Sequence, residues 1–322
     1  MKAAAYHRTG QPDVLEYLDV PDPAVRPGGI VVKVEAISIE GGDTLNRLGG
    51  PLVGDPHIVG YQCAGTVVEV GEGVTSRLVG DRVVATMPFG SHAELVSISA
   101  ASSWPIADGA DIIAAACVPI AFGTADDCLF EFGHLQDGET VLVQAGAGGV
   151  GLAAIQLAKQ AGATVFATAS SDDRLERIAA MDLGLDHGIN YRDIDAAEAV
   201  KKLTDGRGVD LVVDPVGGPT LVSSLQALAY RGRCITVGQA GRNPQPIDVS
   251  QLMGGNQSLT GVFLGAELSR PRARAMIARH LTDVAERRLT VVVDRTFPLS
   301  EAAAAHEYLE SRQAVGRVVL IP

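Results

Sequence analysis

Three glycines between residues 141 and 151 have the spacing of a nucleotide-binding loop. The segment reads VLVQAGAGGVG, so Gly146, Gly148 and Gly151 form the pattern Gly-x-Gly-x-x-Gly directly after a β-branched run and before LAAIQLAKQAGA. The first glycine allows a tight turn, the second lets the backbone approach a pyrophosphate, and the third lets the helix pack closely on its strand. The N–H groups and positive dipole end of that helix then face the phosphates. We therefore predict a dinucleotide site rather than a simple connecting turn, because the next strand follows at the expected distance.

The end of that next strand indicates which nicotinamide coenzyme binds. NAD enzymes place an acid there, about 20 residues after the glycines, to hold the ribose 2′-hydroxyl. The segment VFATASSDDRLE instead has Ser170 and Ser171, which can donate hydrogen bonds to a 2′-phosphate, and Arg174, which can pair with its charge. In the alternative interpretation Ser171 caps a helix and Arg174 is a solvated surface charge. We expect NADPH rather than NADH.

Strand-like and helix-like segments alternate from about residue 122 to 266. The expected strands are ETVLVQAG, ATVFATAS, VDLVVDPVG and GRCITVG, and the expected helices pass through KQAG, DDRLERIAA and LQALAY. This alternation predicts a doubly wound parallel sheet, an α/β fold.

The segments on either side of this region have a different composition. Residues 1–100 are rich in glycine and proline, with short β-branched runs that predict a compact, mostly β domain. After a helix near 270–288, the runs LTVVVDRTF and GRVVLIP flank a helix at 300–311 and resemble the first domain. We therefore expect the chain to return and complete its first domain, and two domains suit a length of 322 residues.

Composition narrows the range of partners. The net charge is −12 without a dense basic cluster, which argues against binding to nucleic acid or anionic membranes and favours a small molecule or a basic partner. The N-terminus lacks the apolar core of a signal peptide, and no run approaches the length of ~20 apolar residues that a membrane span needs, so we expect a cytoplasmic protein. The four cysteines form no CxxC pair and are expected to be reduced, buried thiols.

Six motifs occur in order over nearly the whole chain: VGYQCAGTVVEVGEGV, GDRVVA, AGAGGVGLAAIQLAKQAGATVFATASS, DPVGG, GRCITVG and GRVVLIP. They resemble the zinc-independent quinone oxidoreductases, the zeta-crystallin-like family of the medium-chain dehydrogenase/reductase superfamily. The resemblance implies a GroES-like catalytic domain formed by residues 1–121 and 267–322. It also implies a Rossmann domain over residues 122–266 and a homodimer joined through the Rossmann sheets.

The resemblance also implies positions around the coenzyme. Thr124 would contact the nicotinamide ribose or ring, Gly149 and Val150 would lie on the pyrophosphate, and Tyr191 would join Ser170 and Arg174 at the 2′-phosphate. Val216, Gly238, Phe263 and Leu264 would line the nicotinamide and contact its carboxamide. Arg312 would make one further contact with the cofactor.

Zinc-dependent relatives hold a catalytic metal with Cys, His and a third ligand, and a structural zinc on four closely spaced cysteines. Here Glu40 stands in place of the first ligand, Tyr61 in place of the histidine, and the third region, PIAFGTA, offers no ligand. The cysteine loop is missing as well. A zinc site needs a tetrahedral set of such ligands, so we predict no metal.

The segment SIEGGDTLNR departs from the zinc-free relatives, which commonly carry Asn-x-x-Asp followed two residues later by an aromatic residue. Glu40 replaces the Asn and Leu45 the aromatic residue, whereas Asp43 is retained. Glu40 and Asp43 are, with Tyr61, the candidate catalytic residues. Glu40 can orient the nicotinamide ribose, steer specificity or cap a turn, and the structural roles are favoured. These departures leave the shape of the substrate pocket open.

Without a metal, hydride addition is easiest at a quinone or at a C=C conjugated to a carbonyl, because the charge spreads into a phenolate or enolate. The protein then orients the reactants and stabilises that oxyanion. We hypothesise that Tyr61 donates a hydrogen bond or proton to the developing oxygen; the alternative is a packed tyrosine that lines a strand. An enoyl thioester reductase and a non-catalytic NADPH-binding protein are the competing functions, and no histidine, His92 included, is expected to act as a base.

Overall fold

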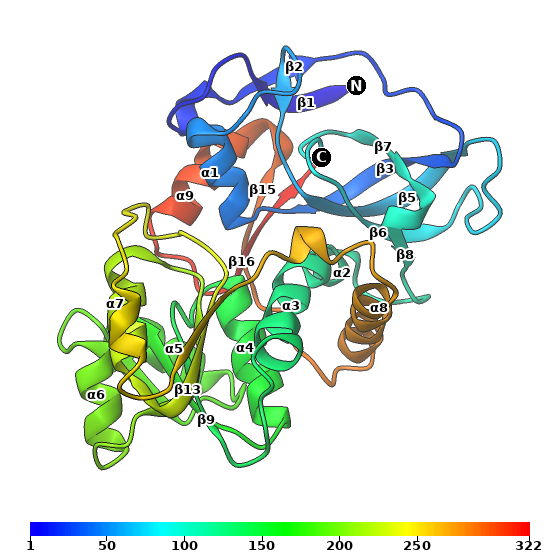
Figure 1. Ribbon diagram of the computed structural model, residues 1–322. Coiled ribbons are helices and arrows are strands. Elements are labelled where there is room, and N and C mark those ends of the chain that lie inside the picture. Colours follow the sequence, from blue (N-terminus) through cyan, green and yellow to red (C-terminus); the bar gives the residue numbers. More distant parts are fainter. The chain divides into compact units, whose positions relative to one another are not determined.

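The computed structural model describes all 322 residues, which form two compact units. The first unit comprises residues 1–120 and 267–322, and the second comprises residues 121–266. The chain leaves the first unit within helix α3 (Val118–Asp126) and returns to it after the short helix η5 (Leu264–Ala266), as the colours in Figure 1 show. The second unit is therefore an insertion in the first.

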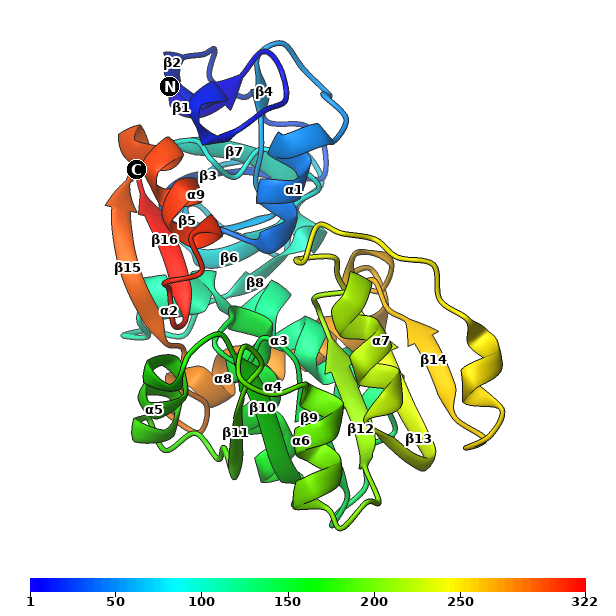
Figure 2. The same cartoon turned by 90° about the vertical axis from the view of Figure 1, so that its left-hand side faces the viewer.

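The second unit is built on a six-stranded parallel sheet in the order β11-β10-β9-β12-β13-β14 (Figure 2). In chain order this is 3-2-1-4-5-6, the order of a doubly wound dinucleotide-binding sheet, and it confirms the predicted α/β fold. The order reverses between β9 and β12, which is where such sheets bind their ligands. The strands are β9 (Thr140–Val143), β10 (Thr164–Ala169), β11 (His187–Asn190), β12 (Val209–Asp214), β13 (Leu228–Thr236) and β14 (Ser258–Gly261).

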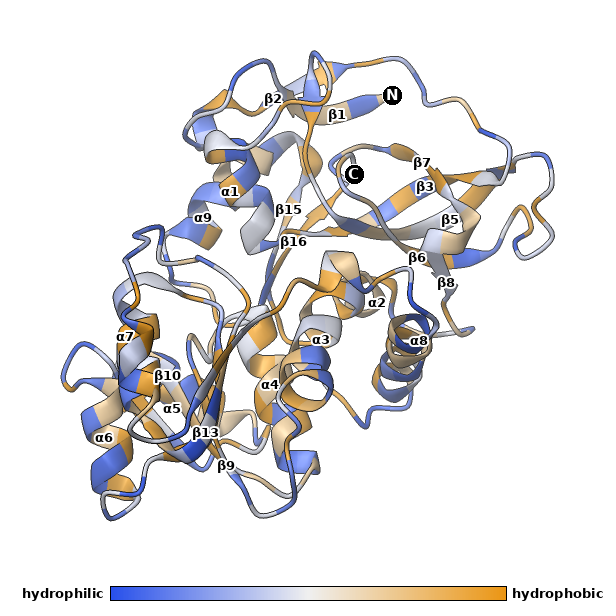
Figure 3. Ribbon diagram, viewed as in Figure 1, coloured by the Kyte–Doolittle hydropathy of each residue, from blue (hydrophilic) through white to orange (hydrophobic).

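Helices cover both faces of this sheet. On one face α6 and α7 pack on each other and share an apolar core with the strands, which includes Leu142, Phe166 and Val212. Figure 3 shows α6 with a hydrophobic and a hydrophilic side, as a helix between core and solvent requires. Right-handed crossovers place α4 and α5 on the other face. The helices are α4 (Gly149–Gln160), α5 (Asp172–Ala180), α6 (Ala196–Leu203) and α7 (Gly218–Gln226).

The helix expected through LQALAY is wrong over its second half. Helix α7 ends at Gln226, and Leu228 already begins β13. The strand bulges here: Val209 pairs with Leu228 but Leu211 pairs with Arg233, and Arg231 in the bulge has a φ of 60°. This irregular stretch lacks the two-residue alternation of a strand, which is why its sequence favours a helix.

The first unit is mostly β. Its large sheet runs β15-β16-β3-β5-β6-β8, with β7 paired to β3, and a small sheet runs β2-β1-β4. The late strand β16 pairs antiparallel with β3, so the end of the chain lies inside the sheet formed by its beginning. The strands are β1 (Lys2–Tyr6), β2 (Glu16–Asp19), β3 (Gly29–Ser38), β4 (His57–Ile58), β5 (Gln62–Val70), β6 (Arg82–Thr86), β7 (Leu95–Ser99), β8 (Ser103–Pro105), β15 (Val293–Pro298) and β16 (Arg317–Ile321).

Four helices belong to the first unit. They are α1 (Gly41–Gly49), α2 (Ile112–Ala116), α8 (Pro271–Ala285) and α9 (Ala302–Glu310). Helix α1 is the one that matters for the candidate site, because it begins at Glu40. Nowhere in the chain is there a helix with the length and apolarity needed to cross a membrane.

Candidate active site

The glycine loop joins β9 to α4 at the carboxyl edge of the sheet in the second unit. A Cβ atom on Gly151 would lie 2.4 Å from the oxygen of Ala145, and one on Gly146 would lie 2.7 Å from the Cβ of Ala167. These two positions therefore require glycine. Gly148 is the N-cap of α4, and the first N–H groups of the helix, including those of Gly149, have no acceptor inside it. This partly exposed backbone, with Val150 beside it, suits a pyrophosphate.

The predicted 2′-phosphate residues lie together at the carboxyl ends of β10 and β11. Nη1 of Arg174 donates to Oγ of Ser170 over 2.9 Å, and the backbone N–H of Tyr191 donates to the oxygen of Ala169 over 3.1 Å. Ser171 is the N-cap of α5, since its Oγ accepts from the N–H of Arg174. Two hydroxyls and a guanidinium at one corner are the donor set that a phosphate ester requires.

The loops after β12 and β13 lie at the same carboxyl edge of the sheet as the glycine loop. Here the turn after Asp214 packs on residues 237–241: the N–H of Gly241 donates to the oxygen of Val216 over 2.9 Å. A Cβ on Gly238 would come within 2.7 Å of the oxygen of Pro215, so the two loops touch backbone to backbone. The structure thus brings Val216 and Gly238 together.

The remaining predicted coenzyme contacts are more dispersed. Leu264 is buried and Phe263 is 76% exposed, and both follow β14. Thr124 lies buried in α3. Arg312 belongs to the first unit, where it is exposed in the turn between α9 and β16.

In the first unit the side chain of Glu40 forms a buried ion pair with Arg317. Its carboxylate accepts from the guanidinium of Arg317 and from the amide of Gln62. Arg317 also donates to Oγ of Ser38 over 2.6 Å and to the oxygen of Ile39 over 2.8 Å. Burial raises the pKa of Glu40, and the guanidinium opposes that rise. Glu40 is also the N-cap residue of α1, so its side chain is fully engaged in the structure of the unit.

Asp43 lies one turn further along α1 and is fully buried. Its Oδ2 accepts from the N–H of Glu40 over 2.8 Å, whereas its Oδ1 has no hydrogen-bond partner. Burial raises the pKa of Asp43 well above its ordinary value.

Tyr61 packs its ring against α1. A Cβ on Gly42 would lie 2.4 Å from Cε2 of Tyr61, so the glycine makes room for the ring. The side chain is only partly buried, and its hydroxyl forms no hydrogen bond within the chain. Burial, with the negative charges of Asp43 and Glu40, raises the pKa of Tyr61 to about 12, so the hydroxyl keeps its proton at neutral pH and can donate it.

Aromatic rings that the sequence did not single out hold Tyr61 from the other side. The ring centroid of Phe89 lies 6.4 Å from that of Tyr61 and 5.0 Å from that of His57. Asn46 accepts from the hydroxyl of Tyr6 over 2.9 Å and lies 3.0 Å from Nε2 of His57. Tyr61 therefore packs beside an aromatic cluster in which Tyr6 and His57 both contact Asn46, whereas its own hydroxyl is not engaged there.

Comparison with known proteins places the chain in a family. The families described as alcohol dehydrogenase GroES-like domain and zinc-binding dehydrogenase match residues 26–108 and 149–281. A quinone oxidoreductase of Pseudomonas aeruginosa and a 2-haloacrylate reductase of a Burkholderia species are each 35% identical to it, over 99% of this chain and 98% of the relative. The chain belongs to the quinone oxidoreductase family of the medium-chain dehydrogenase/reductase superfamily.

This membership confirms both the predicted family and the fold class, a GroES-like domain with a Rossmann sheet. It also makes the chain an oxidoreductase. The solved structure of the Escherichia coli quinone oxidoreductase complexed with NADPH superposes with a TM-score of 0.93 at 29% identity, covering all of both chains.

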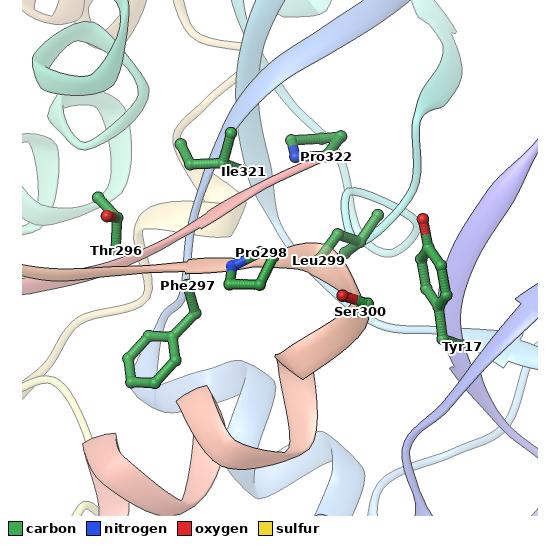
Figure 4. Close-up of a pocket in the computed structure, with 8 residues that line it drawn as sticks. All are labelled: Tyr17, Thr296, Phe297, Pro298, Leu299, Ser300, Ile321 and Pro322. Atoms are coloured by element: carbon green, nitrogen blue, oxygen red, sulfur yellow. The ribbon is translucent and has the colours of Figure 1, made fainter.

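The first unit also has a surface hollow of about 350 Å³. As Figure 4 shows, it lies along β15 and β16, between Phe297, Leu299 and Tyr17. None of the predicted site residues lines it.

Proposed function

We propose that the chain transfers a hydride to a quinone, or to a C=C conjugated to a carbonyl, with NADPH as the coenzyme and without zinc. The observation that carries the proposal is the Arg174–Ser170 contact beside the glycine loop at the reversal point of the sheet. When bound, NADPH supplies the hydride. The coenzyme of the Escherichia coli relative supports this choice. The residues proposed to hold it are Thr124, Gly146, Gly148, Gly149, Val150, Gly151, Ser170, Ser171, Arg174, Tyr191, Val216, Gly238, Phe263, Leu264 and Arg312.

Tyr61 is the proposed proton donor. Its hydroxyl is protonated at neutral pH, partly exposed and not engaged by another side chain, so it is available to an acceptor oxygen that gains negative charge. Water can then restore the proton. Asp43 and Glu40 support this role indirectly, because they fix the start of α1, on which the Tyr61 ring packs. We do not propose that either carboxylate touches the acceptor.

Zinc independence rests on the chemistry of the replaced ligands. The Glu40 carboxylate is held by Arg317 and Gln62, and a tyrosine stands in place of the histidine. No group of three or more His, Cys, Asp and Glu residues in the structure is arranged to hold a metal ion. The test is elemental analysis of the purified protein together with turnover in the presence of a chelator. Stoichiometric zinc with chelator-sensitive activity would contradict the proposal.

A cytoplasmic homodimer joined through the Rossmann sheets is the proposed state. Strand β14 is an edge strand, and large apolar side chains are exposed in its neighbour β13 and in the segments before and after it: Tyr230, Val249, Met253 and Phe263. Such a patch beside an unpaired strand edge favours pairing with a second copy. The four cysteines are all buried and unpaired, which suits a reducing compartment. Light scattering in solution tests the dimer.

The assay of the proposed activity is the loss of NADPH absorbance with a panel of acceptors: ortho- and para-quinones, open-chain and cyclic enones, a 2-haloacrylate and an enoyl-CoA. NADH is run in parallel. Turnover of quinones or enones with NADPH preferred is the expected result. Turnover of the enoyl-CoA alone would favour a thioester reductase, and tight NADPH binding without any turnover would favour a non-catalytic binding protein.

A further inference from the structure

Four buried side chains in the second unit form a continuous chain of hydrogen bonds below the carboxyl edge of the sheet. The N–H of Ala145 donates to Oγ1 of Thr168 over 3.1 Å, and that hydroxyl donates to Oε1 of Gln144 over 2.8 Å. Nε2 of Gln144 donates to Oγ of Ser224 over 3.1 Å, and Ser224 donates to Oδ2 of Asp214 over 2.8 Å. All four side chains are at most 1% exposed.

The direction of this chain is fixed from its acidic end. A carboxylate only accepts, so the single proton of the Ser224 hydroxyl points to Asp214 and its oxygen accepts from the amide nitrogen of Gln144. The amide oxygen of Gln144 then faces Thr168 and accepts a hydrogen bond from its hydroxyl, and the oxygen of Thr168 accepts from the backbone N–H of Ala145. Each hydroxyl proton is used once. Removing one member therefore leaves its neighbours unsatisfied in the core.

The two ends of the chain lie in different loops of the proposed coenzyme site. At one end Ala145 opens the glycine loop with a φ of 53°, a conformation that a residue with a Cβ rarely adopts. At the other end Oδ1 of Asp214 accepts from the N–H groups of Val216 and Gly217 over 2.7 and 2.9 Å. These bonds hold the turn whose Val216 is proposed to contact the nicotinamide. Both loops therefore depend on side chains from other elements: Thr168 of β10 for the glycine loop and Ser224 of α7 for the turn after Asp214.

We propose that Thr168, Gln144, Ser224 and Asp214 are positioning residues that set the separation between the glycine loop and the Val216 turn, so that one dinucleotide engages both. They are too deeply buried to touch the coenzyme themselves. The proposal rests on the proposed coenzyme site. It predicts that breaking the chain weakens ligands that span the two loops and spares ligands that bind at one place only.

The test compares the dissociation constants of NADPH and of adenosine 2′,5′-bisphosphate, which reaches only the adenosine end, by fluorescence titration of the intact protein. Thr168→Val removes the hydroxyl and keeps the shape, and we expect NADPH to bind about tenfold more weakly while the fragment changes by less than about twofold. Thr168→Ser keeps the hydroxyl and should restore NADPH binding. The double variant Thr168→Val/Ser224→Ala should be no weaker than either single variant, because the chain is already broken.

Thr140→Val is the matched structural control. Thr140 is a buried threonine at the opposite end of β9, where its hydroxyl donates to Oδ2 of Asp210 over 2.8 Å. This variant should lower the thermal midpoint like Thr168→Val and leave the NADPH dissociation constant unchanged. Equal loss of NADPH and fragment binding in Thr168→Val, or the same loss in Thr140→Val, would overturn the positioning role. Failure of the wild-type protein to bind NADPH would instead contradict the proposed function.

Discussion

Mild acid should destabilise the first unit through two buried histidines. The Nε2 atoms of His92 and His306 lie 3.1 Å apart, and both rings are fully buried. Nη1 of Arg47 lies 3.3 Å from Nδ1 of His306. Because a guanidinium only donates, His306 accepts at Nδ1 and donates from Nε2 to His92. This arrangement requires both histidines to be neutral.

The magnitude follows from proton linkage. Burial lowers the pKa of His92 to about 3. Burial, with His92 and Arg47 nearby, lowers the pKa of His306 well below its ordinary value. Both histidines titrate near 6.5 in the unfolded chain. The unfolded state therefore binds more protons as the pH falls below that value, and stability present at pH 7.5 is lost toward pH 5.5. At about pH 5.5 each histidine that stays neutral in the folded state lowers the free energy of unfolding by about 1.4 kcal/mol, and the pair by about 2.8 kcal/mol.

Trp104 is the single tryptophan, buried in the first unit, so its fluorescence during urea unfolding reports on that unit. Asp43 acts in the opposite sense over part of this range because burial raises its pKa, and comparison with variants separates the two effects. His92→Gln should remove about half of the histidine contribution. His134→Asn, at an exposed histidine with a φ of 50°, should keep the whole of it. An unchanged pH dependence in His92→Gln would refute the reasoning.

Three further predictions concern the proposed site. Tyr61→Phe should lower kcat about 100-fold without changing the NADPH dissociation constant, since the ring stays and only the proton donor is lost; full turnover would exclude this role. Arg174→Gln should weaken NADPH at least about tenfold and leave NADH unchanged in direct titrations, and equal effects on both would exclude a 2′-phosphate contact. Glu40→Gln should cost about 3 kcal/mol of stability because it leaves Arg317 buried and unpaired, whereas the joint change Glu40→Gln/Arg317→Met should recover part of it; equal thermal midpoints for wild type and Glu40→Gln would contradict this.

The second unit was predictable because its signals are local. Each strand is a short β-branched run, and the glycine pattern that predicts the dinucleotide site lies within six consecutive residues. The helix predicted over Leu228–Tyr230 was wrong because the signal there is not local. The bulge around Arg231 depends on pairing with β12, which no local sequence pattern indicates.

The first unit depends on distant partners. Helix α1 begins with two glycines, poor helix formers, and is fixed by Asp43 and by the Tyr61 ring. Glu40 meets Arg317 across 277 positions of sequence, and His92 meets His306 across 214. The family resemblance could therefore single out Glu40 and Tyr61 as unusual, but it could not predict which side chains surround them.

The pairing of β16 with β3 has a consequence for synthesis of the chain. Residues 121–266 leave the ribosome as one uninterrupted segment and can fold while the remainder is still being made. Folding of the first unit is completed later, because Arg317, the counterion of Glu40, is translated 277 positions after it and behind the whole second unit. Until then Glu40 has a carboxylate without its cation, and burial of that charge is unfavourable. A chain that stops before β16 should thus carry a folded nucleotide-binding unit on an unfinished partner and be open to proteases.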